Sequence, residues 1–228
     1  AGRQSIARVA FRGGLTTHWA VEIRGRSAVS VHDCSFVDFF DSAVVWGGRA
    51  TSMDGPPATY ATGNAFHHNV VTNSAFCDAL FCRGALYLGG QEGMEIYENT
   101  ISTVGRAAGA SGWPIKAQVN DGYLRGVRIY RNRLTATNTA PFDFAIELFH
   151  VTGVEVFDNT LVGSVDSNAQ TLQAPYAFSL RVYRNEISHP AVSPTINFGG
   201  GNAGVIIEFE SAGVELFENR IRTVARCF

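Results

Sequence analysis

One short pattern of apolar and polar residues returns along the whole chain. Five copies read EIYENTI (95–101), RIYRNRL (128–134), EVFDNTL (155–161), RVYRNEI (181–187) and ELFENRI (215–221). AFHHNVV (65–71) is a more divergent copy, and SVHDCSF (30–36) has Cys34 where the others have Asn. Apolar and polar residues alternate before the Asn, which is typical of a β-strand, and the alternation changes phase after it. The pattern therefore predicts two strands joined by a tight corner.

The six Asn residues follow one another at intervals of 26 to 34 residues. They are Asn69, Asn99, Asn132, Asn159, Asn185 and Asn219. A fixed motif with spacers of variable length predicts stacked coils with loops of unequal length. Asn tolerates the left-handed backbone that a tight corner demands, and its amide can hydrogen-bond to the Asn of the next coil. We therefore expect an asparagine ladder along one corner of the stack.

A second turn precedes each corner, because Gly stands six residues before the Asn in five copies. These are Gly63, Gly93, Gly126, Gly153 and Gly213. A further apolar strand comes before this Gly, as in ALYL (85–88) and AIEL (145–148). Three short strands per coil predict an all-β, single-stranded parallel β-helix of about seven coils. Residues 1–228 then form one domain, and because neither end carries a helix that would cap the stack, we expect a segment of a longer protein.

The outward positions support stacking independently. At two outward positions the charge alternates in sign from coil to coil. Four residues before the Asn, this row is Glu95, Arg128, Glu155, Arg181 and Glu215. One residue before the Asn, it is Glu98, Arg131, Asp158, Arg184 and Glu218. Opposite charges on neighbouring strands stabilise a sheet. Two residues before the Asn lies a row of rings, His32, His67, Tyr97, Tyr130, Phe157, Tyr183 and Phe217. We expect these rings to stack.

The motif, with its Asn corner and preceding Gly turn, resembles the right-handed parallel β-helices of the pectin-lyase-like superfamily. The resemblance covers about residues 20–226. The superfamily includes polysaccharide lyases, glycoside hydrolases, epimerases and non-enzymatic surface and fibre proteins. The resemblance therefore implies the fold, its right-handedness and a secreted or cell-surface location, while the activity has to be argued from the site.

Composition narrows the function classes. The net charge is −2 and the pI about 6.3, a balance that does not indicate nucleic acid or an anionic membrane as partner. No apolar stretch is long enough to span a membrane. Cys77 and Cys82 lie in one loop and could form a disulfide in an oxidising compartment. No metal-site spacing occurs, so we expect no cofactor; Asp121 in a turn is only a remote candidate for binding calcium.

In the resembling enzymes, a carbohydrate lies in a groove over the strand that precedes the Gly turn. On these strands we expect Lys116 and Glu147 to be lateral neighbours, with Tyr87 on the other side of Lys116. In a lyase, Lys116 would be the base or charge stabiliser and Tyr87 the proton donor; in a hydrolase, Glu147 would act with Asp143 or Glu208. Further candidates for substrate binding are Trp46, Trp113, Arg83, His150 and Glu208.

Each candidate also has a structural interpretation. Lys116 and Glu147 can form an ordinary cross-strand ion pair, and the Trp side chains can anchor loops. Two function classes therefore stay open: a carbohydrate-binding or carbohydrate-degrading β-helix with a polysaccharide as partner, and a non-enzymatic structural or adhesive repeat of a surface protein. In the second, further coils or a partner chain would cover the uncapped ends.

Overall fold

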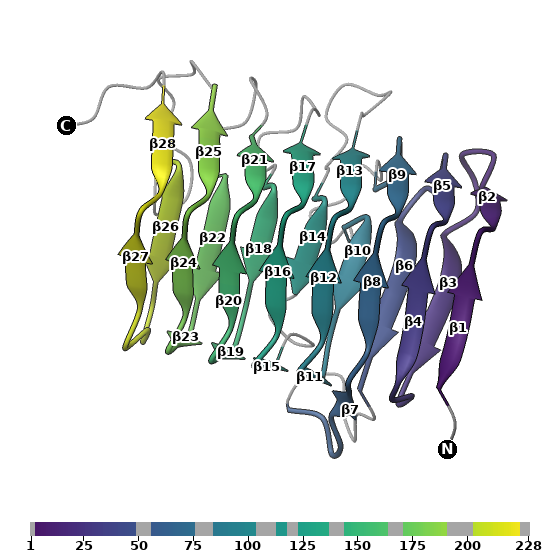
Figure 1. Ribbon diagram of the computed structural model, residues 1–228, viewed down its shortest axis with the longest axis horizontal. Coiled ribbons are helices and arrows are strands. Elements are labelled where there is room, and N and C mark those ends of the chain that lie inside the picture. Colours follow the sequence, from purple (N-terminus) through teal and green to yellow (C-terminus); the bar gives the residue numbers. More distant parts are fainter. Residues whose placement is uncertain are drawn as a thin grey trace.

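The structure is a computed structural model that describes residues 3–48, 56–75, 84–103, 113–117, 123–136, 144–163, 171–190 and 203–223. The described residues form β-strands and turns, and every strand pairing among them is parallel. The strands lie in four sheets, which we call A, B, C and D, and each sheet takes one short strand from successive coils. The chain is therefore a parallel β-helix, as the sequence motif predicts (Figure 1).

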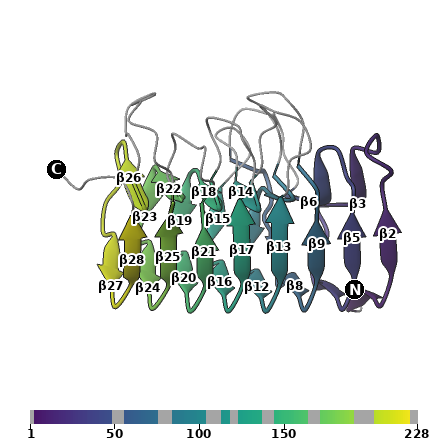
Figure 2. The same ribbon diagram turned by 90° about the horizontal axis from the view of Figure 1, so that it is seen from above.

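Sheets A and B meet at the predicted corner. Sheet A contains β1 (Gln4–Ala7), β4 (Val29–His32), β8 (Ala65–His67), β12 (Glu95–Tyr97), β16 (Arg128–Tyr130), β20 (Glu155–Phe157), β24 (Arg181–Tyr183) and β27 (Glu215–Phe217). Sheet B contains β2 (Ala10–Arg12), β5 (Ser35–Val37), β9 (Val70–Thr72), β13 (Thr100–Thr103), β17 (Arg133–Ala136), β21 (Thr160–Val162), β25 (Glu186–His189) and β28 (Arg220–Thr223). Figure 2 shows sheet B along one side of the stack.

Sheet C carries the strands before the Gly turn, and a short sheet D lies between sheets C and A. Sheet C contains β3 (Trp19–Arg24), β6 (Ser42–Gly47), β10 (Leu86–Leu88), β14 (Ile115–Ala117), β18 (Ile146–Leu148), β22 (Leu172–Pro175) and β26 (Val205–Glu208). Sheet D contains β7 (Ala61–Thr62), β11 (Gln91–Glu92), β15 (Leu124–Arg125), β19 (Val151–Thr152) and β23 (Ala177–Phe178). Five coils therefore have four strands where the sequence predicted three.

The number of coils also differs slightly from the prediction. Sheets A and B have eight strands each, whereas the motif marks seven corners. The additional coil contains β1 and β2, and its corner is at Arg8 and Val9, where the motif is absent. Arg8 nevertheless has a φ of 57°, close to that of the other corners.

The left-handed residue at each A–B corner is not the Asn, as the sequence analysis expected, but the residue directly before it. These residues are Asp33, His68, Glu98, Arg131, Asp158, Arg184 and Glu218, with φ between 52° and 55°. At the turn before sheet A, the five predicted Gly residues have φ from 55° to 64°. In two further coils, Ala28 and Ser179 take this conformation, which is strained for a residue with a Cβ atom.

The asparagine ladder is confirmed. Asn69, Asn99, Asn132, Asn159 and Asn185 each donate from Nδ2 to Oδ1 of the next Asn, over 2.9 to 3.2 Å. The same Oδ1 accepts the main-chain N–H of the preceding Asn, as Asn132 Oδ1 does from Asn99 at 3.0 Å. Nδ2 also donates to a carbonyl of the preceding coil, for example from Asn132 to Ile96. Each buried amide is therefore satisfied, and the ladder ties every corner to the next.

The outward rows on sheet A stack as predicted. Arg128 forms ion pairs with Glu95 and Glu155, and Arg181 with Glu155 and Glu215. The seven rings two residues before the corner lie in one stack, with centroids 4.6 to 5.0 Å apart. Inside the stack, equivalent apolar residues form buried rows such as Ile96, Ile129, Val156 and Val182. The core thus runs along the axis of the helix, and the side chains that point outward are left for binding.

Candidate functional site

The outward face of sheet C brings the predicted catalytic residues together. The pairing of β10, β14 and β18 aligns Tyr87 with Lys116 and Lys116 with Glu147, the neighbours that the sequence analysis expected. Lys116 Nζ lies 3.3 Å from Glu147 Oε2 and 3.7 Å from the centroid of the Trp113 ring. Both charged side chains are buried, with 5% and 7% of their surfaces exposed. The pair is therefore a desolvated ion pair beside an aromatic face.

The electrostatics of Glu147 follow from this burial. Desolvation raises the pKa of the Glu147 carboxyl group, and the cation of Lys116 partly opposes the rise. A carboxyl group with a raised pKa beside a lysine could serve as a general acid or base, since perturbed groups of this kind occur at catalytic sites as well as in structural pairs. The catalytic roles of Lys116, Glu147 and Tyr87 stay predictions.

The remaining sheet C candidates lie at different depths. Trp46 and Trp113 are 0% and 2% exposed, and neither indole presents a face to solvent. Glu208, the candidate hydrolase partner of Glu147, does not lie in the same row. Glu147 is aligned with Gln173 and Gln173 with Ile206, whereas Glu208 is aligned with Pro175. Glu208 Oε2 still accepts a hydrogen bond from Gln173 Nε2 at 2.5 Å. The substrate-binding roles of Trp46, Trp113 and Glu208 stay predictions.

Several residues of the sequence analysis lie outside the described part of the chain. They are Arg83, Cys77, Cys82, Asp121 and Asp143, together with most residues of the long loops between coils. Among the described cysteines, Cys34 is buried and free. The described residues contain no group of three or more side chains arranged to hold a metal ion. Nor does the described chain include a helix long and apolar enough to cross a membrane.

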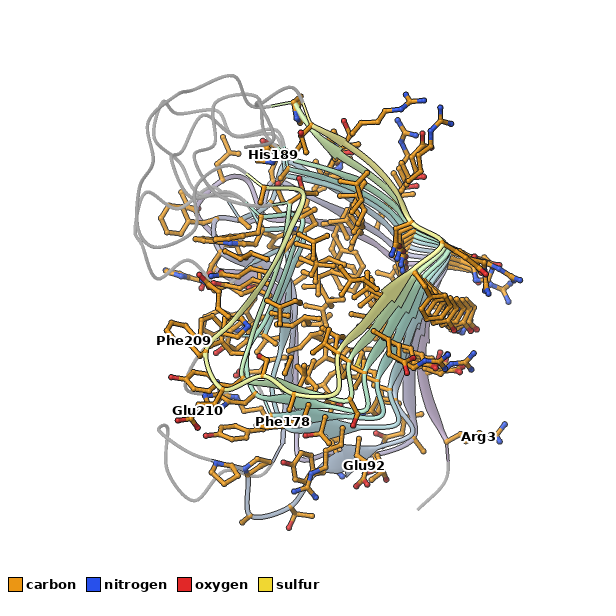
Figure 3. All side chains as sticks on the ribbon, turned by 90° about the vertical axis from the view of Figure 1, so that its left-hand side faces the viewer. Arg3, Glu92, Phe178, His189, Phe209 and Glu210 are labelled. Carbon is orange, nitrogen blue, oxygen red and sulfur yellow. The ribbon has the colours of Figure 1, made fainter. Side chains whose placement is uncertain are left out.

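His150 belongs to a different surface, which the sequence analysis did not identify. Together with Tyr123, Tyr176 and Phe209 it forms a stack of four rings at the corner between sheets C and D, with centroids 4.6, 4.8 and 5.1 Å apart. We call these four residues the corner stack. Phe209 at its end is 66% exposed, and nearby Phe178 is 43% exposed. Viewed along the axis of the helix, Phe209, Glu210 and Phe178 lie at one corner, away from Arg3 (Figure 3).

The corner stack has an unusual backbone. Tyr123, His150, Tyr176 and Phe209 all have φ between 52° and 55°, a region in which bulky residues are rare. Gly90 has the same conformation at the equivalent place, where glycine adopts it without strain. The A–B corners have the same conformation, which costs about 1–2 kcal/mol per residue and marks each turn of the coil, so it does not by itself indicate a functional site. Ring-on-ring contacts offset part of this cost.

A cavity of about 300 Å³ adjoins the corner stack. It is lined by Pro56, Tyr60, Tyr123, Leu124, Arg125, His150, Thr152, Tyr176 and Phe178. The guanidinium of Arg125 lies 4.1 Å from the centroid of the Tyr60 ring. Among the described residues, no carboxylate lies within ion-pair distance of Arg125. The cavity thus combines aromatic walls with an exposed guanidinium, and Glu92 is the cross-strand neighbour of this arginine.

A sequence signal for this surface exists. Tyr60, Tyr123, His150 and Tyr176 each stand nine residues before an Asn of the ladder. Phe209 stands ten residues before Asn219, so its coil is one residue longer. Only the strand and corner positions of the motif were aligned in the sequence analysis, and the row at nine residues before the Asn was therefore missed.

Comparison with known proteins adds little to this geometry. No protein-family model matches the chain, and no curated protein matches it. One solved structure that resembles it is the surface protein and adhesin PfbA of Streptococcus pneumoniae, with 10% sequence identity and a TM-score of 0.49. The match covers 95% of this chain and 64% of that structure. We base no statement about activity or partners on it.

Proposed function

We propose that the chain is a carbohydrate-binding β-helix of a secreted or cell-surface protein, and that a polysaccharide binds along the corner stack. The observation that carries the proposal is the row of four outward rings beside a cavity. Aromatic side chains with exposed apolar surface and few charges suit the apolar faces of sugar rings. The resemblance to the pectin-lyase-like superfamily is consistent with a carbohydrate ligand and with this location.

Binding to a panel of soluble polysaccharides, measured by affinity electrophoresis, tests the proposal. We expect at least one polymer to retard the protein and the double variant Tyr176→Ala/Phe209→Ala to lose about tenfold or more in affinity, as truncation of a binding aromatic typically does. Phe217→Ala is the matched control, because Phe217 also ends a ring stack, on sheet A. Equal losses in both variants, or no retardation by any polymer, would contradict the proposal.

A polysaccharide-degrading activity is the second candidate. It is favoured by the buried Lys116–Glu147 pair with its raised Glu147 pKa, next to Tyr87. A lyase that acts on uronate polymers forms an unsaturated product whose absorbance can be followed directly. Activity that disappears in Lys116→Ala but persists in Arg131→Ala would support this candidate. Without turnover on any uronate polymer, the pair is a structural element of sheet C, and the chain binds without catalysis.

A further inference from the structure

Two imidazoles face each other at one A–B corner. His67 and His68 directly precede Asn69, at the two positions that carry a ring and a charged side chain in the other coils with an Asn corner. Their Nδ1 atoms lie 2.8 Å apart, and the two rings are nearly perpendicular, with an interplanar angle of 81°. This coil therefore brings together two ring nitrogens, and a neutral imidazole nitrogen is a common metal ligand.

The left-handed backbone of the corner makes this contact possible. Successive side chains of a regular strand point to opposite faces, so the rings of two neighbouring histidines would diverge. His67 ends β8 and points outward in the ring stack, whereas His68 has a φ of 55° and turns its ring toward that of His67. The side chain of His68 is 48% exposed, so an ion can reach the pair from solvent.

The far nitrogen of each ring already has a partner in the protein. His68 Nε2 lies 2.6 Å from Glu98 Oε2, and this carboxylate assigns the ring proton to Nε2 and the lone pair to Nδ1. His67 Nε2 lies 3.1 Å from Ser30 Oγ, which can accept a hydrogen bond in the same way. Histidines that bind metals have this arrangement, with one nitrogen on the ion and the other donating to an oxygen.

The charges around the pair suit a bound cation. Burial, followed by the effects of His32 and His68, lowers the pKa of His67, so its ring is neutral at pH 7, as a metal ligand has to be. Sheet A aligns His32, His67 and Tyr97, so the residues that follow them, Asp33, His68 and Glu98, form one row along the corner. One carboxylate therefore stands on each side of His68, and both attract a dication.

We propose that His67 and His68 bind one divalent transition-metal ion through their Nδ1 atoms, with water in the remaining positions. The described residues contain no group of three ligands, which agrees with two protein ligands. Zn–N bonds of about 2.0–2.1 Å in tetrahedral geometry place two nitrogens about 3.3 Å apart, so the pair has to open by about 0.5 Å. Imidazole suits Zn²⁺ and Cu²⁺, whereas Ca²⁺ and Mg²⁺ prefer oxygen ligands. The site on sheet A is independent of carbohydrate binding at the corner stack.

Calorimetric titration of the chelator-treated protein, without an affinity tag, with Cu²⁺ or Zn²⁺ tests the site. We expect one ion per chain, bound at least about tenfold more weakly by His68→Gln, which lacks one ligand. This variant keeps the corner, because Glu98 and Arg131 adopt the same backbone with long side chains. His32→Gln is the matched control and should bind like the wild type. His32 stacks on His67, but its Nδ1 is engaged by Asp33 at 2.7 Å.

Glu98→Gln tests the outer partner separately from the ligands. It keeps an oxygen that can accept from His68 Nε2 but removes the charge, and should weaken binding about tenfold, as the loss of such partners does. Glu95→Gln removes an equal charge from the neighbouring row, where Glu95 pairs with Arg128, and should leave the affinity unchanged. With Cu²⁺, pulsed electron paramagnetic resonance should detect two imidazoles in the wild type and in Glu98→Gln, but one in His68→Gln.

The outcomes are distinct. Equal affinity of the wild type and His68→Gln, or a single imidazole on Cu²⁺ in the wild type, refutes the site and leaves the pair as a hydrogen bond between two histidines. Binding of Ca²⁺ as tight as that of Zn²⁺ refutes coordination by imidazole. Equal losses in Glu95→Gln and Glu98→Gln overturn the specific role of Glu98, because net charge would then determine the affinity. None of these results depends on whether a polysaccharide binds.

Discussion

At the scale of single residues, the asparagine ladder determines the stability of the corner. Asn132 Oδ1 accepts two hydrogen bonds from Asn99, and its Nδ2 donates to Ile96 and Tyr130 carbonyls. Asn132→Ala removes all of these and leaves buried groups without partners, at about 1–3 kcal/mol for each such group. We expect a loss of about 3–5 kcal/mol in the free energy of unfolding, measured by urea denaturation.

The last member of the ladder provides the comparison. Asn219 is only half-buried and has no further Asn beyond it among the described residues. Water can replace its amide more easily, so Asn219→Ala should lose about 1–2 kcal/mol. Equal losses for Asn132→Ala and Asn219→Ala would show that burial does not govern the strength of the ladder.

Cys34 shows how the ladder begins. Its Sγ lies 3.2 Å from the His32 carbonyl oxygen and 3.7 Å from that of Ile6, the positions that an Asn amide contacts in later coils. A thiol is a weak donor and offers little acceptor strength to the first coil. Cys34→Asn should therefore stabilise the protein by about 1 kcal/mol in thermal unfolding. Cys34→Ser serves as the control, because its hydroxyl cannot span both coils. If Cys34→Ser gained as much stability as Cys34→Asn, the argument would be contradicted.

The sequence predicted these corner residues because burial and hydrogen bonding strongly favour Asn there, with Cys34 as the exception. It did not predict the left-handed residue before the Asn, since His68, Glu98 and Arg131 share no chemical property that marks such a backbone. The corner stack was missed for a different reason, because the row of rings nine residues before the Asn was not aligned. Tyr123, His150 and Tyr176 occupy positions at which Gly would be expected from backbone preference alone.

At the scale of elements, sheet C contains the buried ion pair whose role is open. Replacing Lys116 by Met leaves the Glu147 carboxylate desolvated without its cation, and replacing Glu147 by Met removes the carboxylate beside the buried Lys116 ammonium. Each single variant should lose about 3 kcal/mol at pH 7, whereas the double variant, with two apolar side chains, should lie within about 1 kcal/mol of the wild type. Urea denaturation of all four proteins gives the coupling energy directly.

The pH dependence of Lys116→Met tests the same element. Burial raises the pKa of Glu147, and in this variant the opposing effect of Lys116 is absent. A carboxyl group whose folded pKa is raised contributes stability below its unfolded pKa and loses it as the pH rises through the folded pKa. The deficit of Lys116→Met should therefore shrink as the pH is lowered from 7 to 5. A constant deficit over this range would mean that Glu147 remains accessible to water in the variant.

The strands of sheet C were predictable from their apolar runs, and the neighbours Lys116 and Glu147 followed from the repeat. The burial of these two side chains could not be predicted in the same way. It depends on what covers the outward face of sheet C, whereas the alternation within a short strand separates only inward from outward residues. Glu208 lies outside the row of Glu147 and Gln173, which stand 12 residues before their ladder Asn. The equivalent place before Asn219 is Ile207, and the additional residue between Phe209 and the ladder brings Ile206 into the row instead.

At the scale of the whole molecule, the ring stack on sheet A changes character along the axis. Its first two described members are imidazoles, His32 and His67, stacked 4.9 Å apart, and His68 Nδ1 lies 2.8 Å from His67 Nδ1. The charged or titratable groups that face His67 are His32, His68, Asp33 and Glu98, together with the stacked phenol ring of Tyr97. Burial, followed by the effects of His32 and His68, lowers the pKa of His67 below its usual value of 6.5. Protonation of His67 is therefore less favourable in the folded state than in the unfolded chain.

The consequence is a loss of global stability in mild acid. Between pH 6.5 and the lower folded pKa of His67, the unfolded chain binds more protons than the folded chain, so the free energy of unfolding falls as the pH falls through this window. His67→Phe keeps an aromatic ring in the row, as Phe157 does in a later coil, but removes the imidazole and with it this dependence of stability on pH. Its melting temperature should therefore decline less than that of the wild type between pH 7.5 and 5.5, while exposed His18→Gln should decline as much as the wild type. Parallel declines in all three proteins would mean that acid destabilises the β-helix through groups other than the stacked imidazoles.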